Sequence, residues 1–138
     1  MNTSRLADPP VNVKLKLSAL WASVMFLYIY ADYFALYKPH QLEAMQAGRM
    51  PGLGMVTQGA LLFAAAMMAI PSLLIAFALV LPPAINRWVN VVAGVLYSAI
   101  IVVTARHDWA FMQAYGVIEI ALTLTVAWLA WRWPREQE

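Results

Sequence analysis

The sequence contains no cysteine, and only 12% of its 138 residues are charged. Without cysteine the chain can form no disulfide and no thiolate metal site, and it cannot use a thiol as a nucleophile or a redox group. The formal net charge of +2 comes from basic residues that are scattered along the chain. A nucleic-acid-binding protein concentrates such residues in a patch or stripe, so we expect no nucleic-acid partner.

Hydrophobic residues take the place of the missing charges and make up 63% of the chain. A soluble domain is about half apolar and about a quarter charged, so the excess is expected to face a lipid bilayer. A helix needs about 20 apolar residues to cross about 30 Å of hydrocarbon. Four spans are predicted, of which the third is the shortest: residues 15–37, 57–81, 88–104 and 109–131.

The first predicted span follows basic residues, as the apolar region of a signal peptide does. It is too long for such a region, and aromatic residues follow where small residues would mark a cleavage site. We therefore expect it to be retained, within a single transmembrane domain over residues 1–138.

The connections between the later spans are short. Residues 82–86, with the sequence PPAIN, predict a tight turn because two prolines cannot continue a helix. Residues 106–108 form another short connection. Short connections favour antiparallel neighbours, so the expected fold is all-α, an antiparallel four-helix transmembrane bundle.

Only the first connection, residues 38–55, is long. Within it Leu42, Met45 and Met50 roughly follow helical spacing, and Pro51 with Gly52 would end a helix. The pattern fits a short helix that lies in the membrane interface, and it also fits an irregular surface loop.

Lysine and arginine are divided unequally between the two sides of the predicted bundle, six against three. Cytoplasmic loops hold the excess of these residues, so the tails at 1–14 and 132–138 are expected to be cytoplasmic. The six are Arg5, Lys14, Lys16, Arg87, Arg132 and Arg135, and the three are Lys38, Arg49 and Arg106.

Tryptophans lie mostly near the predicted span ends, which is typical of the aromatic belt of a membrane protein. They are Trp21, Trp88, Trp109, Trp128, Trp131 and Trp133.

Pairs of small residues one helical turn apart predict close helix packing in the second and third spans. The pairs are Ala60 and Ala64, Ala65 and Ala69, and Gly94 and Ser98. Pro71 lies inside the second span, where it removes a backbone hydrogen bond and frees the Met67 carbonyl. A kink is therefore expected there.

Two acidic side chains fall within the predicted spans, Asp32 and Glu119. Asp32 lies about 9 Å from the middle of its span at 1.5 Å per residue, which places it near the outer interface. Glu119 lies at the middle of the fourth span, where a charged group costs about 2.5–3.5 kcal/mol on insertion scales. It is expected to face the bundle and to be paired or protonated, with Asp32 at the mouth of its site.

Helical spacing gives each acid polar companions. Tyr115, Glu119 and Thr123 share one face of the fourth span, as Tyr28 and Asp32 do on the first. In antiparallel helices, Tyr28 is level with Glu119 and Tyr115 is level with Asp32. If the first and fourth spans are neighbours, these side chains form one site. With Tyr97 of the third span as a further partner for Glu119, the ligand-binding or proton-coupling candidates are Tyr28, Asp32, Tyr97, Tyr115, Glu119 and Thr123.

His40, His107 and Asp108 lie just outside the outer span ends and are weak candidates for a metal site. Their spacing matches no HExxH-type motif, and no span has the histidine pair that haem ligation would need. The sequence therefore demands no metal and no cofactor.

Several stretches resemble an uncharacterised family of small four-span bacterial inner-membrane proteins: residues 17–37 (LSALWASVMFLYIYADYFALY), VTQG, AIPSLLIAFALVLP, NRWVN, and residues 116–134 (GVIEIALTLTVAWLAWRWP). The similarity runs from the first span to the closing WRWP. A YADYF-like stretch and a VEIAL-like stretch are represented by Tyr30–Phe34 and Ile118–Leu122. The resemblance implies a bacterial inner-membrane location and no particular activity. Small multidrug transporters are similar in size and span number, but their essential glutamate lies in the first span.

Two functions fit these observations. In the first, a small amphipathic molecule, lipid or quinone binds in, or is transported through, a pocket open to the outer side. In the second, the protein is a structural or accessory subunit that associates with itself or with another membrane protein, and Glu119 is a hydrogen-bonded structural acid. An enzyme is less favoured, because the sequence contains no nucleophile–base pair or metal motif.

Overall fold

The computed structural model describes residues 9–50 and 52–134. The elements in order are α1 (Val13–Ala35), α2 (Gln41–Gln46), β1 (Arg49–Met50), β2 (Gly54–Met55), α3 (Gln58–Val80), α4 (Pro83–Ala105) and α5 (Ala110–Trp131). Arg5 and Arg135, which entered the charge count above, lie outside the described residues.

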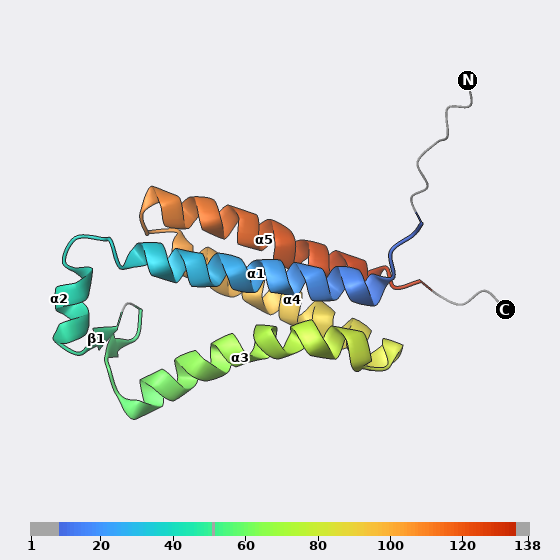
Figure 1. The fold of residues 1–138 in the computed structure, drawn as a ribbon, viewed down its shortest axis with the longest axis horizontal. Coiled ribbons are helices and arrows are strands. Elements are labelled where there is room, and N and C mark those ends of the chain that lie inside the picture. The colour runs from blue at the N-terminus through green and yellow to red at the C-terminus, as the bar shows by residue number, and fades with distance from the viewer. Residues whose placement is uncertain (1–8, 51, 135–138) are drawn as a thin grey trace, which may run out of the picture.

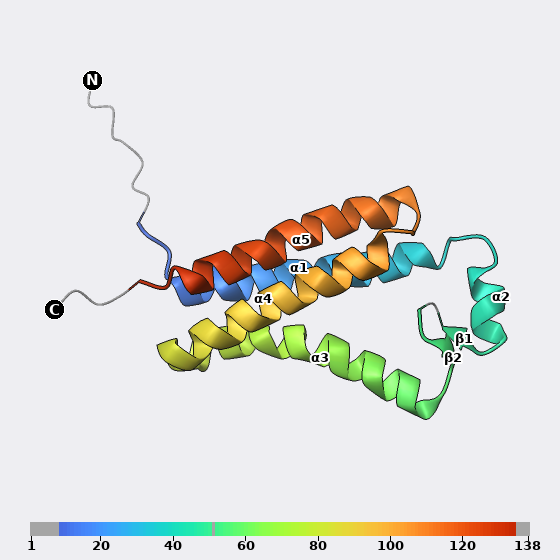
Figure 2. The same ribbon diagram turned by 180° about the vertical axis from the view of Figure 1, so that it is seen from behind.

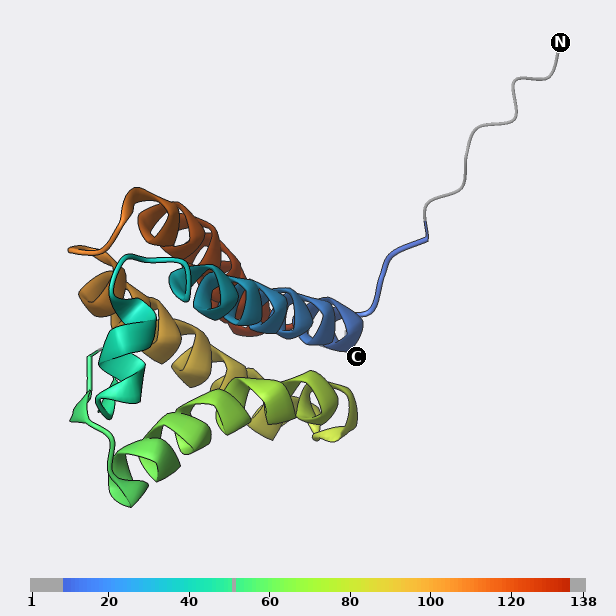
Figure 3. The same ribbon diagram turned by 60° about the vertical axis from the view of Figure 1, so that its left-hand side comes forward.

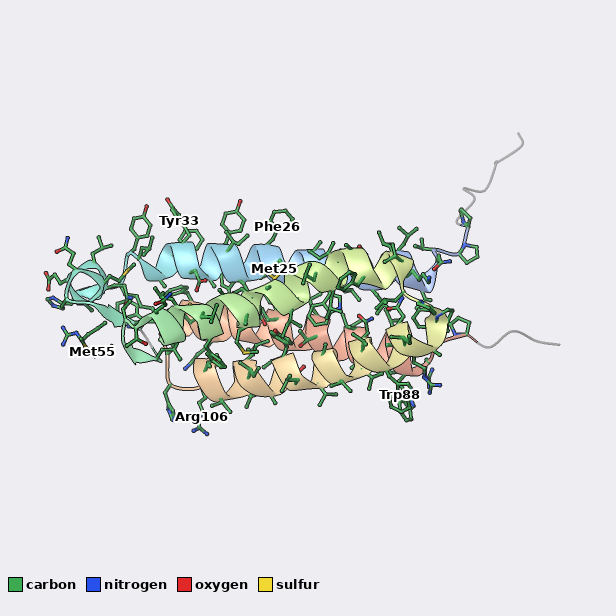
Figure 4. The ribbon with its side chains drawn as sticks, turned by 90° about the horizontal axis from the view of Figure 1, so that it is seen from below. Met25, Phe26, Tyr33, Met55, Trp88 and Arg106 are labelled. Atoms are coloured by element: carbon green, nitrogen blue, oxygen red, sulfur yellow. The ribbon has the colours of Figure 1, made fainter. Side chains whose placement is uncertain are left out.

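Four of the helices, α1, α3, α4 and α5, are long and apolar enough to cross a membrane. They run in alternating directions and lie side by side in one bundle (Figure 1). The predicted all-α, antiparallel four-helix fold is therefore confirmed, and the chain is a membrane protein. Phe26 and Tyr33 point away from the bundle on one side, and Trp88 and Arg106 on the other (Figure 4).

The two ends of the bundle differ. One end, which we call the loop end, holds α2, the β1–β2 hairpin and the α4–α5 connection at residues 106–109 (Figures 1 and 2). The opposite end, the terminal end, holds residues 9–12, residues 132–134 and the two-residue connection between α3 and α4.

Of the two structures that fit the first connection, the short helix is present, as α2. The hairpin that follows was not expected; it pairs Arg49 with Met55 and Met50 with Gly54 in antiparallel register. Gly52 and Gly54 have φ angles of 75° and 76°, a backbone conformation that glycine adopts without steric cost. Gly52, which was expected only to end a helix, therefore lies in a tight turn of the hairpin.

The prediction of a tight turn over residues 82–86 is wrong in its extent. Pro83 is the first residue of α4, so only Leu81 and Pro82 separate α3 from α4. Proline is well tolerated at the first helical position, because its missing N–H would have no partner there and its φ angle already suits a helix. Helix α4 consequently has 23 residues, the same length as α1 and α3.

Helix α5 packs against both α1 and α4, whereas α3 packs on α1 and touches α4 at few points. Towards the loop end α3 diverges from α4 (Figures 2 and 3). The first and fourth long helices, α1 and α5, are neighbours, which is the condition on which the predicted site depended.

The buried core lies in the half of the bundle nearer the terminal end. Trp21 is fully buried in it and stacks edge-on against Tyr97 with ring centroids 5.9 Å apart. Assigning Trp21 to an interfacial belt was therefore wrong, because its indole N–H is satisfied inside the protein. The other core residues include Leu17, Val24, Leu74, Ala78, Val126 and Ala130.

A buried hydrogen-bond network joins three helices in this core. The indole N–H of Trp21 on α1 donates to Asn90 Oδ1 (2.7 Å). Asn90 Nδ2 donates to Asn86 Oδ1 (2.7 Å), and Asn86 Nδ2 donates to the Ala78 carbonyl of α3 (2.7 Å). Both asparagines are fully buried, and the network links α1, α4 and α3 at one level.

Helices α4 and α5 are in close contact at Gly94. A Cβ placed on Gly94 would lie 2.6 Å from the Thr123 carbonyl oxygen and 3.0 Å from the Ala127 backbone nitrogen. Since both neighbours are helix backbone, neither can move aside without moving the helix. The predicted close packing at Gly94 and Ser98 thus describes the α4–α5 contact, whereas Ala65 and Ala69 of α3 are exposed.

We expect Gly94→Ala to destabilise the protein by about 1–3 kcal/mol, because the added methyl group overpacks a helix–helix contact. Gly59→Ala is the matched control, since a Cβ on Gly59 meets no other group closer than 4.0 Å. Thermal unfolding of both variants in the same detergent measures the difference. Equal melting temperatures for the two variants would contradict the close α4–α5 contact.

Candidate ligand-binding cavity

A cavity of about 720 Å³ lies between α1, α3, α4 and α5 in the half of the bundle nearer the loop end. Residues of the β1–β2 hairpin line its rim. Its walls come mainly from apolar side chains, with polar groups at a few positions. The lining residues include Phe63, Ala64, Met67 and Met68 of α3, Ile100, Ile101 and Thr104 of α4, and Met112 of α5.

The shape of α3 leaves this space open. Pro71 lies within α3 and cannot hydrogen-bond to the Met67 carbonyl. The Tyr97 hydroxyl of α4 donates to that carbonyl instead, at 2.5 Å. Beyond this contact α3 bends away from its neighbours (Figures 1 and 3). The freed carbonyl was predicted from Pro71, but its partner was not.

Glu119 of α5 lines the cavity and is only 6% exposed. Asp32 of α1 lines the same cavity and is exposed to it. Within the part of the chain that the structure describes, neither carboxylate forms a hydrogen bond or an ion pair. The two predicted acids therefore share one cavity, with Asp32 closer to the loop end.

Three predicted tyrosines line the same cavity: Tyr28, Tyr97 and Tyr115. Tyr28 is half-buried and lies near Glu119 and Tyr97. The Tyr97 hydroxyl is directed to the Met67 carbonyl, so it serves α3 rather than Glu119. Tyr115 also lines a smaller hollow beside Lys38 at the loop end.

Thr123 lies apart from the other predicted site residues. Its side chain is fully buried between α4 and α5, where its Oγ1 lies 2.7 Å from Ser98 Oγ and donates to the Glu119 carbonyl at 2.8 Å. It does not line the cavity, because it lies one helical turn closer to the terminal end than Glu119. Its contacts join α4 to α5.

An ion pair lies at the loop end of the bundle, beside the cavity. Lys38, just after α1, pairs with Asp108, just before α5, and Asp108 lines the cavity rim. Partial burial would raise the pKa of the Asp108 carboxyl. The hydrogen bonds from Lys38 and from the Trp109 backbone N–H, together with the Lys38 charge, lower this pKa below its ordinary value of 3.8.

The predicted metal candidates do not converge. His40 Nδ1 lies 2.9 Å from Glu43 Oε2 on the surface, and Asp108 pairs with Lys38. In residues 9–50 and 52–134 no three side chains of histidine, cysteine, aspartate or glutamate form a cluster that could hold a metal ion.

Sequence reasoning missed the α3 wall of the cavity, which includes Phe63, Ala64 and Met68. Helix α3 is apolar on every face, so no hydrophobic period distinguishes its inner side. Asn86 and Asn90 were also missed. Their four-residue spacing on one helix, next to Trp88, was the available signal for a buried polar pair.

The fold and the cavity define a small polytopic membrane protein with an internal site between its helices. The chain belongs to the DUF6326 family, a family of unknown function, whose model matches residues 9–138. No curated protein and no solved structure matches the chain.

The Lys38–Asp108 pair gives a pH-dependent contribution to stability. Because the pKa of Asp108 is lower in the folded protein than 3.8, the pair stabilises the fold above pH 3.8, and this contribution is lost as the pH falls through the folded-state pKa. For a partly exposed pair we expect less than about 1 kcal/mol.

Thermal unfolding of the wild type and of Asp108→Asn, compared from about pH 7 to about pH 3, measures this contribution. The wild type should melt higher near neutrality, and the two curves should converge at acid pH. A difference that stays constant down to the lowest pH would show that Asp108 acts by some other contact.

Proposed function

We propose that the protein binds, and moves across or within the membrane, a small amphipathic molecule or lipid that occupies the cavity between α1, α3, α4 and α5. One observation carries the proposal: a cavity of about 720 Å³ has mostly apolar walls and a few polar groups at fixed positions. Ligand pockets are commonly about 300–1,000 Å³ and have this composition.

The position of the polar groups supports an amphipathic occupant. Asp32, Tyr28 and Glu119 lie on the α1–α5 side, whereas Phe63 and Met67 lie on the α3 side. A molecule with one polar and one apolar end would satisfy both sides. The Glu119 carboxylate has no hydrogen-bond or ion-pair partner in the part of the chain that the structure describes. This favours the proposed function over a purely structural acid, which would be held by hydrogen bonds within the bundle.

A saturable photolabelling experiment tests the proposal. The protein is placed in lipid nanodiscs with decanol that bears a diazirine, and the labelled residues are mapped by mass spectrometry. We expect labelling at Met67 and Met112 that excess unlabelled decanol suppresses. Labelling of Leu62, which is 71% exposed on the lipid-facing side, should not saturate.

Two adjacent residues of α3 supply a matched pair of variants. Ala64 lines the cavity and Ala65 does not. Ala64→Phe should fill space that the ligand needs and weaken the saturable labelling at least about fivefold. Ala65→Phe should leave it unchanged. Loss of saturation in both variants, or in neither, would contradict binding in this cavity.

The alternative is an accessory subunit that associates through α3. The exposed Ala65 and Ala69 favour it, because small residues allow a second helix to approach closely. In that case no probe labels the cavity saturably, and Ala65→Phe instead changes the oligomeric state measured in detergent. The same two variants therefore separate the two functions.

We also propose that the protein resides in a bacterial inner membrane with its loop end outside and its terminal end in the cytoplasm. The resemblance of the sequence supports the location. The six lysines and arginines on the side of the two tails, against three on the other side, support the orientation.

The absence of cysteine makes this orientation directly measurable. Val11→Cys and Met55→Cys each introduce one exposed thiol, at the terminal end and the loop end respectively. In intact spheroplasts a membrane-impermeant maleimide should label Met55→Cys and spare Val11→Cys. Both should be labelled after lysis. Labelling of Val11→Cys alone before lysis would establish the inverted orientation.

A further inference from the structure

The described ionisable residues that line the cavity are all acids. Its ionisable lining residues are the three carboxyls of Asp32, Asp108 and Glu119 and the tyrosines. Among the described lining residues there is no lysine, arginine or histidine. Lys38 pairs with Asp108 at the rim, and neither Asp32 nor Glu119 has a positive partner among residues 9–50 and 52–134.

Of the two acids, Glu119 is the more deeply buried. Its side chain is almost completely buried, lines the cavity, and makes no hydrogen bond through its carboxylate to any described residue. A carboxylate in apolar surroundings is costly unless a positive group or a proton accompanies it. Asp32 lies on the adjacent helix α1 and faces the same space, so one positive group could contact both acids.

The rest of the cavity suits an apolar body attached to such a group. Four methionines line it: Met50, Met67, Met68 and Met112. Methionine side chains are flexible and polarizable, so they adapt to apolar ligands of different shape. The ring of Tyr28, beside Glu119, can also attract a cation through its face.

We propose that the cavity selects amphipathic cations: molecules with a protonated amine, held between Asp32 and Glu119, and an apolar chain or ring, held against the methionines of α3 and α5. This inference rests on the proposed function and adds the chemical class of the ligand. A neutral amphipath leaves both acids unpaired, and an anionic one is repelled by them.

Three diazirine probes with the same ten-carbon chain test the selection: an amine, an alcohol and a carboxylic acid. Each is applied to the wild-type protein in nanodiscs of phosphatidylcholine, a zwitterionic lipid with no net charge, and the concentration that half-saturates labelling of Met67 is measured. We expect the amine to bind at least about tenfold more tightly than the alcohol, and the acid to bind most weakly.

Substitutions at the two acids show whether they produce the preference. Glu119→Gln should weaken amine labelling at least about tenfold and leave alcohol labelling within about twofold. Glu43→Gln is the matched control, because Glu43 lies on the surface of α2 outside the cavity. Asp32→Asn, at an exposed position, tests the same preference in a variant whose folding does not depend on a buried side chain.

The outcomes separate this inference from the proposed function. Equal saturation by amine and alcohol, or a preference that survives both Asp32→Asn and Glu119→Gln, overturns cation selection and leaves amphipath binding in place. Tightest binding by the acid also overturns it. Absence of saturable labelling by all three probes overturns the proposed function itself.

Discussion

The hydrogen bonds through Asn86 and Asn90 fix the arrangement on which the other features depend. They tie Trp21 of α1 and the Ala78 carbonyl of α3 to α4, and the side chains of Trp21, Asn86 and Asn90 are all fully buried. Hydrogen bonds between membrane helices contribute about 0.6 to about 1.7 kcal/mol each. The main effect is therefore geometric: three helices are held in one register near the terminal end, and the tightly packed core forms around them.

This network does not extend into the half of the bundle nearer the loop end, where the cavity lies. Gly94 and Thr123 keep α4 and α5 in close contact, but α3 is connected to α4 beyond Pro71 only through the Tyr97 hydroxyl and a few side-chain contacts. The polar groups are distributed accordingly. In the packed half the buried side chains of Asn86, Asn90, Ser98 and Thr123 all have hydrogen-bond partners, and in the open half the Glu119 carboxylate has none among the described residues.

Much of this arrangement could be predicted from the sequence. Apolar length predicted the four helices, and the depth comparison placed Tyr28, Asp32, Tyr115 and Glu119 around one space before any contact was known. Thr123 lies on the same face of α5 as Tyr115 and Glu119, but one turn nearer the terminal end, where α4 and α5 are in close contact. Periodicity gives the face of a helix; it does not give the distance between two helices at each level. For that reason the cavity wall on α3 could not be predicted.

The two-residue connection between α3 and α4 makes these helices the arms of a hinge whose vertex lies at the terminal end. Ala78 and Asn86 lie close to that vertex and are joined by a hydrogen bond, and the separation of the two helices grows with distance from it (Figure 2). Helix α3 is also packed on α1, where Ser18 Oγ donates to the Ile75 carbonyl. The connection therefore fixes the spacing of α3 and α4 at one end only, and the room beside α3 at the other end depends on its contacts with α1.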